Sequence, residues 1–285
     1  GKAMALPAHA STLERAWHYT YLIICGLIFF FLIAPIVEII PLSFNAEPYF
    51  TFTYEMLSLD PEGFSMRWYE DLLGSDVWLR SIANSFFIAI VSTILATTLG
   101  TLAALGLSRR EMPFRAAITA FLISPMIVPL IITAAALFAF YARVNLSQTY
   151  LAIILSHVVL GAPFVVITVT AALSGFDNRL IQASQRLGAD QTTTFFKIIM
   201  PLLLPGIIAG ALFAFITSLD EVVVVLFLAG PEQTPMTVRM FSGLREQISP
   251  TILALASILV ALSIGLLTMM ELLRRRSEAQ RTGRG

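Results

Sequence analysis

Long apolar segments alternate with short polar segments along most of the chain. Uncharged runs occupy residues 16–37, 81–108, 116–142, 144–176, 198–219 and 247–270. Each run is long enough for a helix to cross hydrocarbon, which takes roughly 20 residues. The runs are continuously apolar and lack the alternation of a membrane β-barrel strand. The pattern predicts an all-α membrane protein with six transmembrane helices, at about 20–42, 81–108, 116–142, 150–174, 203–229 and 251–273.

Composition supports this assignment and narrows the functional class. The chain has 285 residues, of which 57% are hydrophobic and 13% are charged, whereas soluble domains carry about 25% charged residues. A soluble enzyme, a nucleic-acid binder and a disordered scaffold therefore fit poorly, and we expect one transmembrane domain over 1–285. Cys25 is the only cysteine, which excludes an intrachain disulfide. No small-residue cleavage site follows the first apolar run, so we expect it to be a retained helix.

The charged residues are unevenly distributed between the connections. Thirteen of the eighteen basic residues fall in the termini and in the second and fourth connections, which predicts that both termini are cytoplasmic. The outer loop 43–80 instead holds seven acidic residues and two arginines. Within it, Phe64 to Leu73 predicts a short amphipathic segment at the interface, because Trp68 and Tyr69 favour that position.

The loop 177–201 combines helix signals with exposed apolar positions. Asp177 and Asp190 are suitable N-terminal caps for two short helices, and Gly188 lies where a left-handed C-terminal cap is expected. We expect Pro201 and Pro205 to break the chain before the fifth span. Apolar helix faces in the cytoplasm predict that this loop docks against a partner.

The spacing in this loop resembles that of the permeases of ATP-binding-cassette importers. Their loop carries Glu-Ala-Ala, three residues, Gly, nine residues, Ile, one residue and Leu-Pro. Here the corresponding residues are Gln182-Ala183-Ser184, then Gly188, Ile198, Met200 and Pro201. Gln, Ser and Met replace Glu, Ala and Leu, and Gln182 cannot offer a charge to an ATPase. The resemblance implies an ATPase-coupling site made of Gln182, Ala183, Ser184, Gly188, Asp190, Ile198, Met200 and Pro201.

The resemblance covers nearly the whole chain and implies a type I ABC importer permease fold, with a cytoplasmic coupling helix between spans four and five. It implies a bacterial inner-membrane protein that pairs with a second homologous permease, two copies of an ATPase and an extracytoplasmic substrate-binding protein. Phe64-Ser-Met-Arg-Trp-Tyr and Ser218-Leu219-Asp220-Glu221 resemble the second permease of spermidine/putrescine importers. The present chain has two lysines, Lys2 and Lys197, and neither follows the Gly-rich turn that a nucleotide-binding phosphate loop requires. We therefore expect no cofactor on this chain, ATP and Mg in the partner ATPase, and no enzyme activity here.

Two acidic residues lie within the predicted fifth span. Asp220 and Glu221 are about 22 Å along that helix from its cytoplasmic start, where a carboxylate is costly and indicates function. Their side chains point about 100° apart, so we expect one to meet the substrate pathway and the other a neighbouring helix or the outer gate. Phe213 and Thr217 complete this predicted pathway, which suits a cationic substrate such as a polyamine. An alternative is that both acids lie at the outer interface.

The remaining candidate residues do not indicate a further functional site. His157 is interpreted as a hydrogen-bonded packing histidine, and no catalytic or metal-ligating residues are predicted. One alternative function is an ion-coupled secondary transporter that uses Asp220 and Glu221 and works without an ATPase. Another is an importer permease for an amino acid, thiamine, iron or a phosphonate. An intramembrane enzyme has no support from the motifs.

Overall fold

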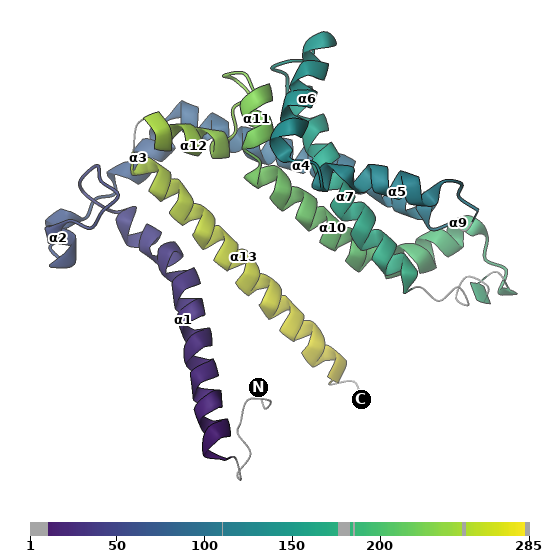
Figure 1. Ribbon diagram of the computed structural model, residues 1–285, viewed down its shortest axis with the longest axis horizontal. Helices are drawn as coiled ribbons and strands as arrows, with labels where there is room; N and C mark the ends of the chain where they lie inside the picture. Colours follow the sequence, from purple (N-terminus) through teal and green to yellow (C-terminus); the bar gives the residue numbers. More distant parts are fainter. Residues whose placement is uncertain (1–10, 110, 176–182, 185, 247–248, 283–285) are drawn as a thin grey trace. The chain divides into compact units, whose positions relative to one another are not determined.

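The computed structural model describes residues 11–109, 111–175, 183–184, 186–246 and 249–282, and these are helical over most of their length (Figure 1). The chain divides into two compact units, Gly1–Ser75 with Gly243–Gly285, and Asp76–Ser242. The two units are distinguished by the contacts that residues make within the chain. The single transmembrane domain expected over 1–285 stays a prediction.

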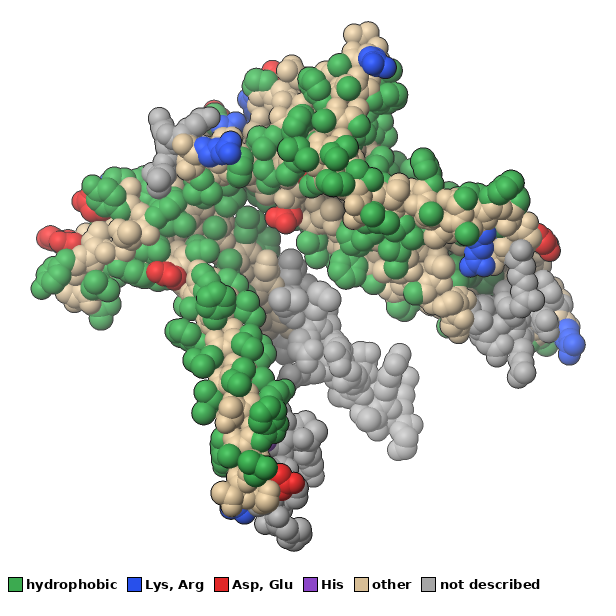
Figure 2. Space-filling view, in the orientation of Figure 1, with side chains coloured by type: hydrophobic (Ala, Val, Ile, Leu, Met, Phe, Trp, Pro, Cys, Tyr) green, Lys and Arg blue, Asp and Glu red, His purple; other side chains and the backbone are tan. Residues whose placement is uncertain are grey.

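The first unit contains the two terminal helices and a folded connection. Its elements are α1 (Thr12–Leu42), α2 (Tyr54–Leu57), η1 (Pro61–Gly63), α3 (Arg67–Gly74) and α13 (Thr251–Thr282). α1 begins with a capping box, in which the Ser11 and Glu14 side chains each accept a hydrogen bond from the other residue's backbone N–H. Most of its large apolar side chains are exposed, as Figure 2 shows along this helix. Such a surface suits contact with lipid or with another membrane helix.

Residues 43–75 fold around a buried asparagine. The Asn45 side chain accepts from the Glu47 N–H at 2.9 Å and donates to the Tyr49 and Thr51 carbonyls. The Trp68 indole N–H donates to the Asn45 carbonyl at 2.7 Å. α3 is then joined to α13, because Thr251 donates its hydroxyl hydrogen to Asp71. This connection is a folded element within the first unit.

The second unit is built on three long helices. Its elements are α4 (Asp76–Leu107), α5 (Arg115–Ile123), η2 (Ser124–Met126), α6 (Leu130–Arg143), α7 (Tyr150–Ser174), α9 (Gln191–Thr194), η3 (Phe195–Ile199), α10 (Met200–Asp220) and α11 (Val223–Leu228). α12 (Met236–Glu246) begins in this unit and ends in the other.

Glycines allow α4, α7 and α10 to approach one another closely. A Cβ atom on Gly100 of α4 would lie 2.7 Å from the Cβ of Val165 in α7. A Cβ atom on Gly210 of α10 would lie 2.8 Å from the Cα of the same valine. Small residues at helix contacts are typical of membrane proteins, where close packing takes the place of the hydrophobic effect. α7 is therefore the central helix of this unit.

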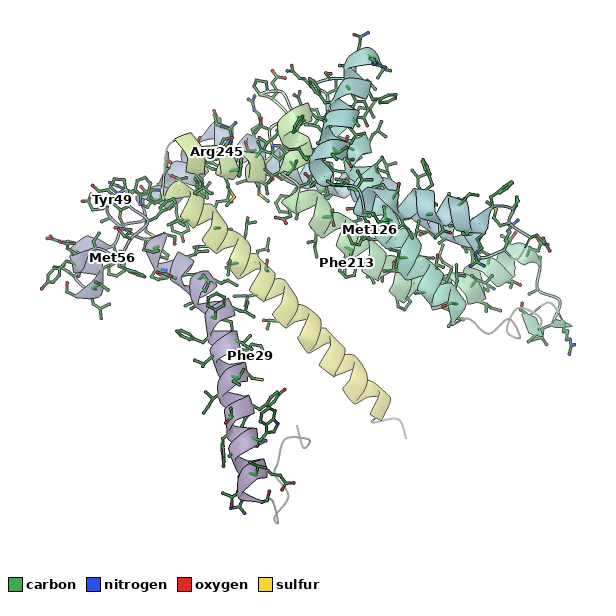
Figure 3. All side chains as sticks on the ribbon, in the orientation of Figure 1. Phe29, Tyr49, Met56, Met126, Phe213 and Arg245 are labelled. Atoms are coloured by element: carbon green, nitrogen blue, oxygen red, sulfur yellow. The ribbon has the colours of Figure 1, made fainter. Side chains whose placement is uncertain are left out.

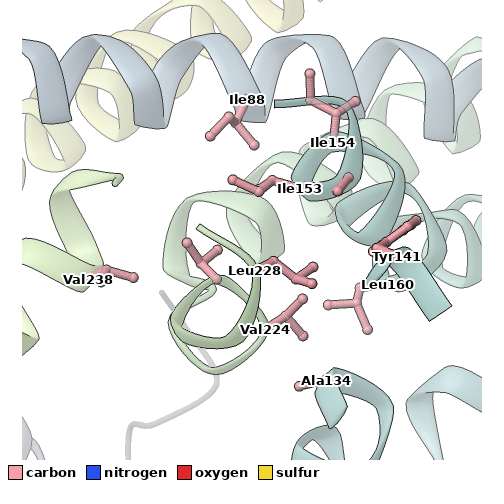
Figure 4. Packing of buried hydrophobic residues seen from close by; sticks show 11 residues of the cluster. Ile88, Ala134, Tyr141, Ile153, Ile154, Leu160, Val224, Leu228 and Val238 are labelled. Atoms are coloured by element: carbon pink, nitrogen blue, oxygen red, sulfur yellow. The ribbon is translucent and has the colours of Figure 1, made fainter. Parts of the chain in front are cut away.

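A second set of buried side chains connects α7 with the shorter helices. Figure 4 shows Ile153 and Leu160 of α7 packed with Tyr141 of α6 and with Val224 and Leu228 of α11. The short helices are thus held by apolar contacts even though they are too short to be stable alone.

The predicted third span is strongly bent. The sequence predicted one helix over 116–142, whereas Arg115–Met126 and Leu130–Arg143 meet at 99°. Pro129 lies at the break, where its ring disfavours helical conformation for Val128 and removes one backbone donor. Both halves are helical and apolar, so the pair is either one broken span or a re-entrant loop.

Within the described residues, the helices long and apolar enough to cross a membrane number four, or five with the bent pair. The four are Thr12–Leu42, Asp76–Leu107, Tyr150–Ser174 and Gln191–Asp220. Thr251–Gly265 is a shorter apolar segment of α13. The six spans stay a prediction.

Candidate functional site

The loop that resembles the coupling segment is built around two hydrogen-bonded residues. Ser184 is buried, and its hydroxyl lies 2.9 Å from the Thr194 hydroxyl. Gly188 has a φ of +82°, the left-handed conformation that glycine adopts most readily. The chain therefore turns at Gly188 between the helical residues 183, 184 and 186 and α9.

Asp190 caps α9. Its carboxylate accepts a hydrogen bond from the Thr193 N–H at 3.0 Å. Hydrogen bonds from the Thr193 side chain and backbone hold the pKa of Asp190 below its usual range. The carboxylate is therefore charged and fixes the start of the helix at neutral pH.

The helix then continues through the prolines, which corrects the expected break before the fifth span. α9, η3 and α10 follow one another without an interruption from Gln191 to Asp220. η3 is a π-helical turn, and the N–H of Met200 donates to the Phe195 carbonyl five residues earlier. This wider turn stands directly before Pro201, which has no N–H of its own to continue the α-helical pattern. Pro201 is in the first turn of α10, where proline is tolerated.

A shallow groove of about 580 Å³ lies across this segment. It is lined by Ala183, Ser184, Leu187, Ala189, Thr193, Lys197, Ile198, Pro201 and Leu202. Leu187 is 89% exposed at its edge. The structure thus brings together Ala183, Ser184, Ile198 and Pro201 of the predicted coupling residues. Gly188, Asp190 and Met200 shape the segment without lining the groove, and Gln182 lies outside the described residues.

The far end of α10 differs from the sequence prediction. The predicted span continued to residue 229, but α10 ends at Asp220 and the extended residue Glu221 follows it. Glu221 is only 7% exposed, and its carboxylate accepts a hydrogen bond from the Val224 N–H at 2.8 Å. Because this carboxylate satisfies a free backbone donor of α11, it stabilises a helix break that contains no proline or glycine.

Asp220 has a different environment from its neighbour. It is exposed, on the same face of α10 as Phe213 and Ile216, with Thr217 half-buried beside them. Phe213 is 52% exposed and projects from α10 (Figure 3). Its ring stacks against Phe164 of α7, with 5.8 Å between centroids. An aromatic surface and a carboxylate on one exposed face can bind a cation.

Two polar networks have no counterpart in the predicted pathway. His157 is buried and hydrogen-bonded to Ser218, in agreement with its interpretation as a packing residue. Asn84 of α4 donates to the Glu232 carbonyl at 2.8 Å and accepts from the Tyr150 hydroxyl, which ties the segment before α12 to α4 and α7. Polar residues at helical spacing in α4, such as Ser81, Asn84 and Ser85, are the signal that could have revealed this contact.

Comparison with known proteins decides the family. Residues 96–278 match the family described as binding-protein-dependent transport system inner membrane component. The chain belongs to this family. Members are permease subunits of transporters and not enzymes, so the permease itself is a transport protein of the inner membrane.

The permease is similar to polyamine transport proteins over most of its length. It is 34% identical over 250 residues to the spermidine/putrescine transport system permease protein PotC of Haemophilus influenzae, covering 88% of this chain and 94% of that protein. It is 31% identical over 265 residues to the putrescine transport system permease protein PotI of Escherichia coli (strain K12), covering 89% and 90%.

Solved structures show the same fold at lower identity. A chain of a bacterial ABC transporter that imports the acidic polysaccharide alginate superposes with a TM-score of 0.68 at 14% identity, over 94% of this chain and 99% of that chain. A second alginate transporter structure, in complex with a periplasmic protein bound to an alginate pentasaccharide, gives 0.64 at 18% identity, over 90% and 93%. The permease therefore has the all-helical fold of ABC importer permeases.

Proposed function

We propose that the permease is one of two membrane subunits of an ATP-driven importer that moves a polyamine into the cell by alternating access. The observation that supports a polyamine as the cargo is the 34% identity to a spermidine/putrescine permease over 88% of the chain. The proposal includes six spans, with both termini in the cytoplasm. It also includes a second homologous permease, two ATPase copies with ATP and Mg, and a periplasmic substrate-binding protein.

The groove at residues 183–202 is the proposed docking site for the ATPase. Its lining is mainly apolar with one basic residue, Lys197, and the apolar Leu187 is exposed at its edge. A groove of this kind accommodates a helix or a hydrophobic side chain of a partner. Because the helix is continuous from Gln191 to Asp220, a displacement at the groove is transmitted along α10.

The exposed face of α10 is the proposed contact for the cation. Asp220 offers an exposed carboxylate, and the stacked rings of Phe213 and Phe164 offer an aromatic surface on the same unit. Ammonium groups bind both kinds of surface. Glu221 already caps α11 with its carboxylate, so Asp220 is the acid assigned to the cation.

A reconstituted complex in liposomes tests this function. We expect ATP hydrolysis and uptake to rise when the binding protein is loaded with spermidine or putrescine. Uptake by this chain alone, driven by an ion gradient, would instead establish the ion-coupled transporter. Stimulation only by an amino acid, thiamine, iron or a phosphonate would leave the importer assignment intact and overturn the cargo.

A further inference from the structure

Three buried polar residues join α4, α7 and α10 near the end of α10. His157 of α7 is 3% exposed, and its Nδ1 lies 2.6 Å from the hydroxyl oxygen of Ser218 in α10. The same hydroxyl lies 3.1 Å from the hydroxyl of Ser92 in α4. One serine thus connects the last turn of α10 to two other helices.

The number of available hydrogens determines the direction of these bonds. Ser92 has one hydroxyl hydrogen and donates it to the Ile88 carbonyl at 2.6 Å. Ser92 therefore accepts from the Ser218 hydroxyl, and the Ser218 oxygen accepts from the Nδ1–H of His157. Nδ1 therefore carries a hydrogen, and Nε2 has no hydrogen-bond partner within the described part of the chain.

Ser218 is close to the proposed cation contact. It lies two residues before Asp220, at which α10 ends. A serine hydroxyl within a helix commonly donates to the carbonyl four residues earlier, and such a bond does not join the helix to its neighbours. Ser218 bonds to α7 and α4, so these helices hold the turn that carries Asp220.

We propose that His157 is a positioning residue that acts through Ser218 to set the direction in which Asp220 presents its carboxylate. This inference rests on the proposed function, in which Asp220 contacts the cation. The bond from Nδ1–H to the Ser218 oxygen fixes the turn that leads to Asp220.

Matched substitutions at His157 separate the hydrogen bond from the side-chain volume. The amide nitrogen of asparagine takes the place of Nδ1, whereas that of glutamine takes the place of Nε2. In proteoliposomes containing the whole complex, we expect His157→Gln to raise the KM for radiolabelled spermidine roughly fivefold, as the loss of one buried hydrogen bond predicts. His157→Asn should restore the wild-type KM, and kcat should change little in both.

Ser156→Ala is the control on the same helix. Ser156 is fully buried, but it donates only within α7, to the Ala152 carbonyl at 2.8 Å. The variant Ser156→Ala should leave the KM for spermidine unchanged. If His157→Gln prevents assembly of the complex, Ser92→Ala tests the same network from α4 and should raise the KM by a smaller factor.

A double-mutant cycle shows whether His157 acts through Asp220. In the Asp220→Asn background, His157→Gln should raise the KM no further. Additive effects, or equal KM values for the Gln and Asn variants of His157, would overturn the positioning role. An unchanged KM in Asp220→Asn would overturn the proposed cation contact. A raised KM in Asp220→Asn, together with a wild-type KM for the single variant His157→Gln, would overturn this inference alone.

Discussion

The two ends of α10 deal with helix interruption in opposite ways. At the groove end, two prolines lie within or beside the helix, and the helix continues because a π-helical turn precedes Pro201. At the other end, there is no proline or glycine between Phe213 and Gly230, yet the helix ends at Asp220. The carboxylate of Glu221 stabilises that break by accepting from the next helix. Helix continuity therefore depends on where free backbone groups find partners, more than on the presence of proline.

The largest expected effect tests the turn at the groove end. Gly188→Leu should reduce ATPase co-purification and coupled uptake more than tenfold, because a left-handed conformation costs a non-glycine residue about 1–2 kcal/mol and the loop would rearrange. Nothing lies within 4 Å of a Cβ built on Gly188, so the cost is conformational and not a clash. Gly188→Asn is the matched control, since asparagine tolerates this conformation. Equal losses in the Leu and Asn variants would contradict this explanation.

The next effect tests the break at the other end. Glu221→Leu should lower the free energy of unfolding by about 0.5–2 kcal/mol, the usual range for loss of a helix cap. Thermal unfolding of the purified complex measures this change. Asp220→Leu is the comparison at the neighbouring exposed site and should reduce stability much less. A larger loss for Asp220→Leu would reverse the roles assigned to the two acids.

Pro201→Ala should produce a moderate effect on coupling. Alanine restores the missing N–H, so the π-helical turn before it can convert to α-helix and shift the groove residues relative to α10. We expect weaker ATPase co-purification with normal membrane insertion. Pro205→Ala, within the same helix but outside the groove lining, is the control. Unchanged ATP hydrolysis and co-purification in Pro201→Ala would show that the turn has no part in docking.

The smallest effect concerns the cap of α9. Asp190→Ala should speed amide hydrogen exchange in residues 191–194 with little change elsewhere. The lowered pKa of Asp190 makes its contribution to stability present above the usual aspartate pKa and lost as the pH falls through the lowered value. The difference between wild type and variant should therefore shrink in acid. An exchange difference that grows as the pH falls would contradict the capping role.

Sequence reasoning predicted the helical class, because apolar runs are a local property. It also singled out Ala183, Ser184, Ile198 and Pro201, which the structure brings together at one groove. It missed the end of α10, since Glu221 caps through a carboxylate that composition cannot distinguish from a pathway charge. The bend at Pro129 was also missed, although the proline was visible, because many transmembrane helices accommodate proline. The contact between His157 and Ser218 joins residues 61 positions apart and depends on how α7 and α10 pack.

The contact of Val165 with Gly100 and Gly210 limits how the second unit can change shape. Since there is no space for even a methyl group between this valine and either glycine, α4 and α10 are each at their closest approach to α7. Tightly packed contacts of this kind do not deform gradually. We therefore expect a conformational cycle in this unit to displace the three helices together, with their mutual distances constant while distances to partner subunits change.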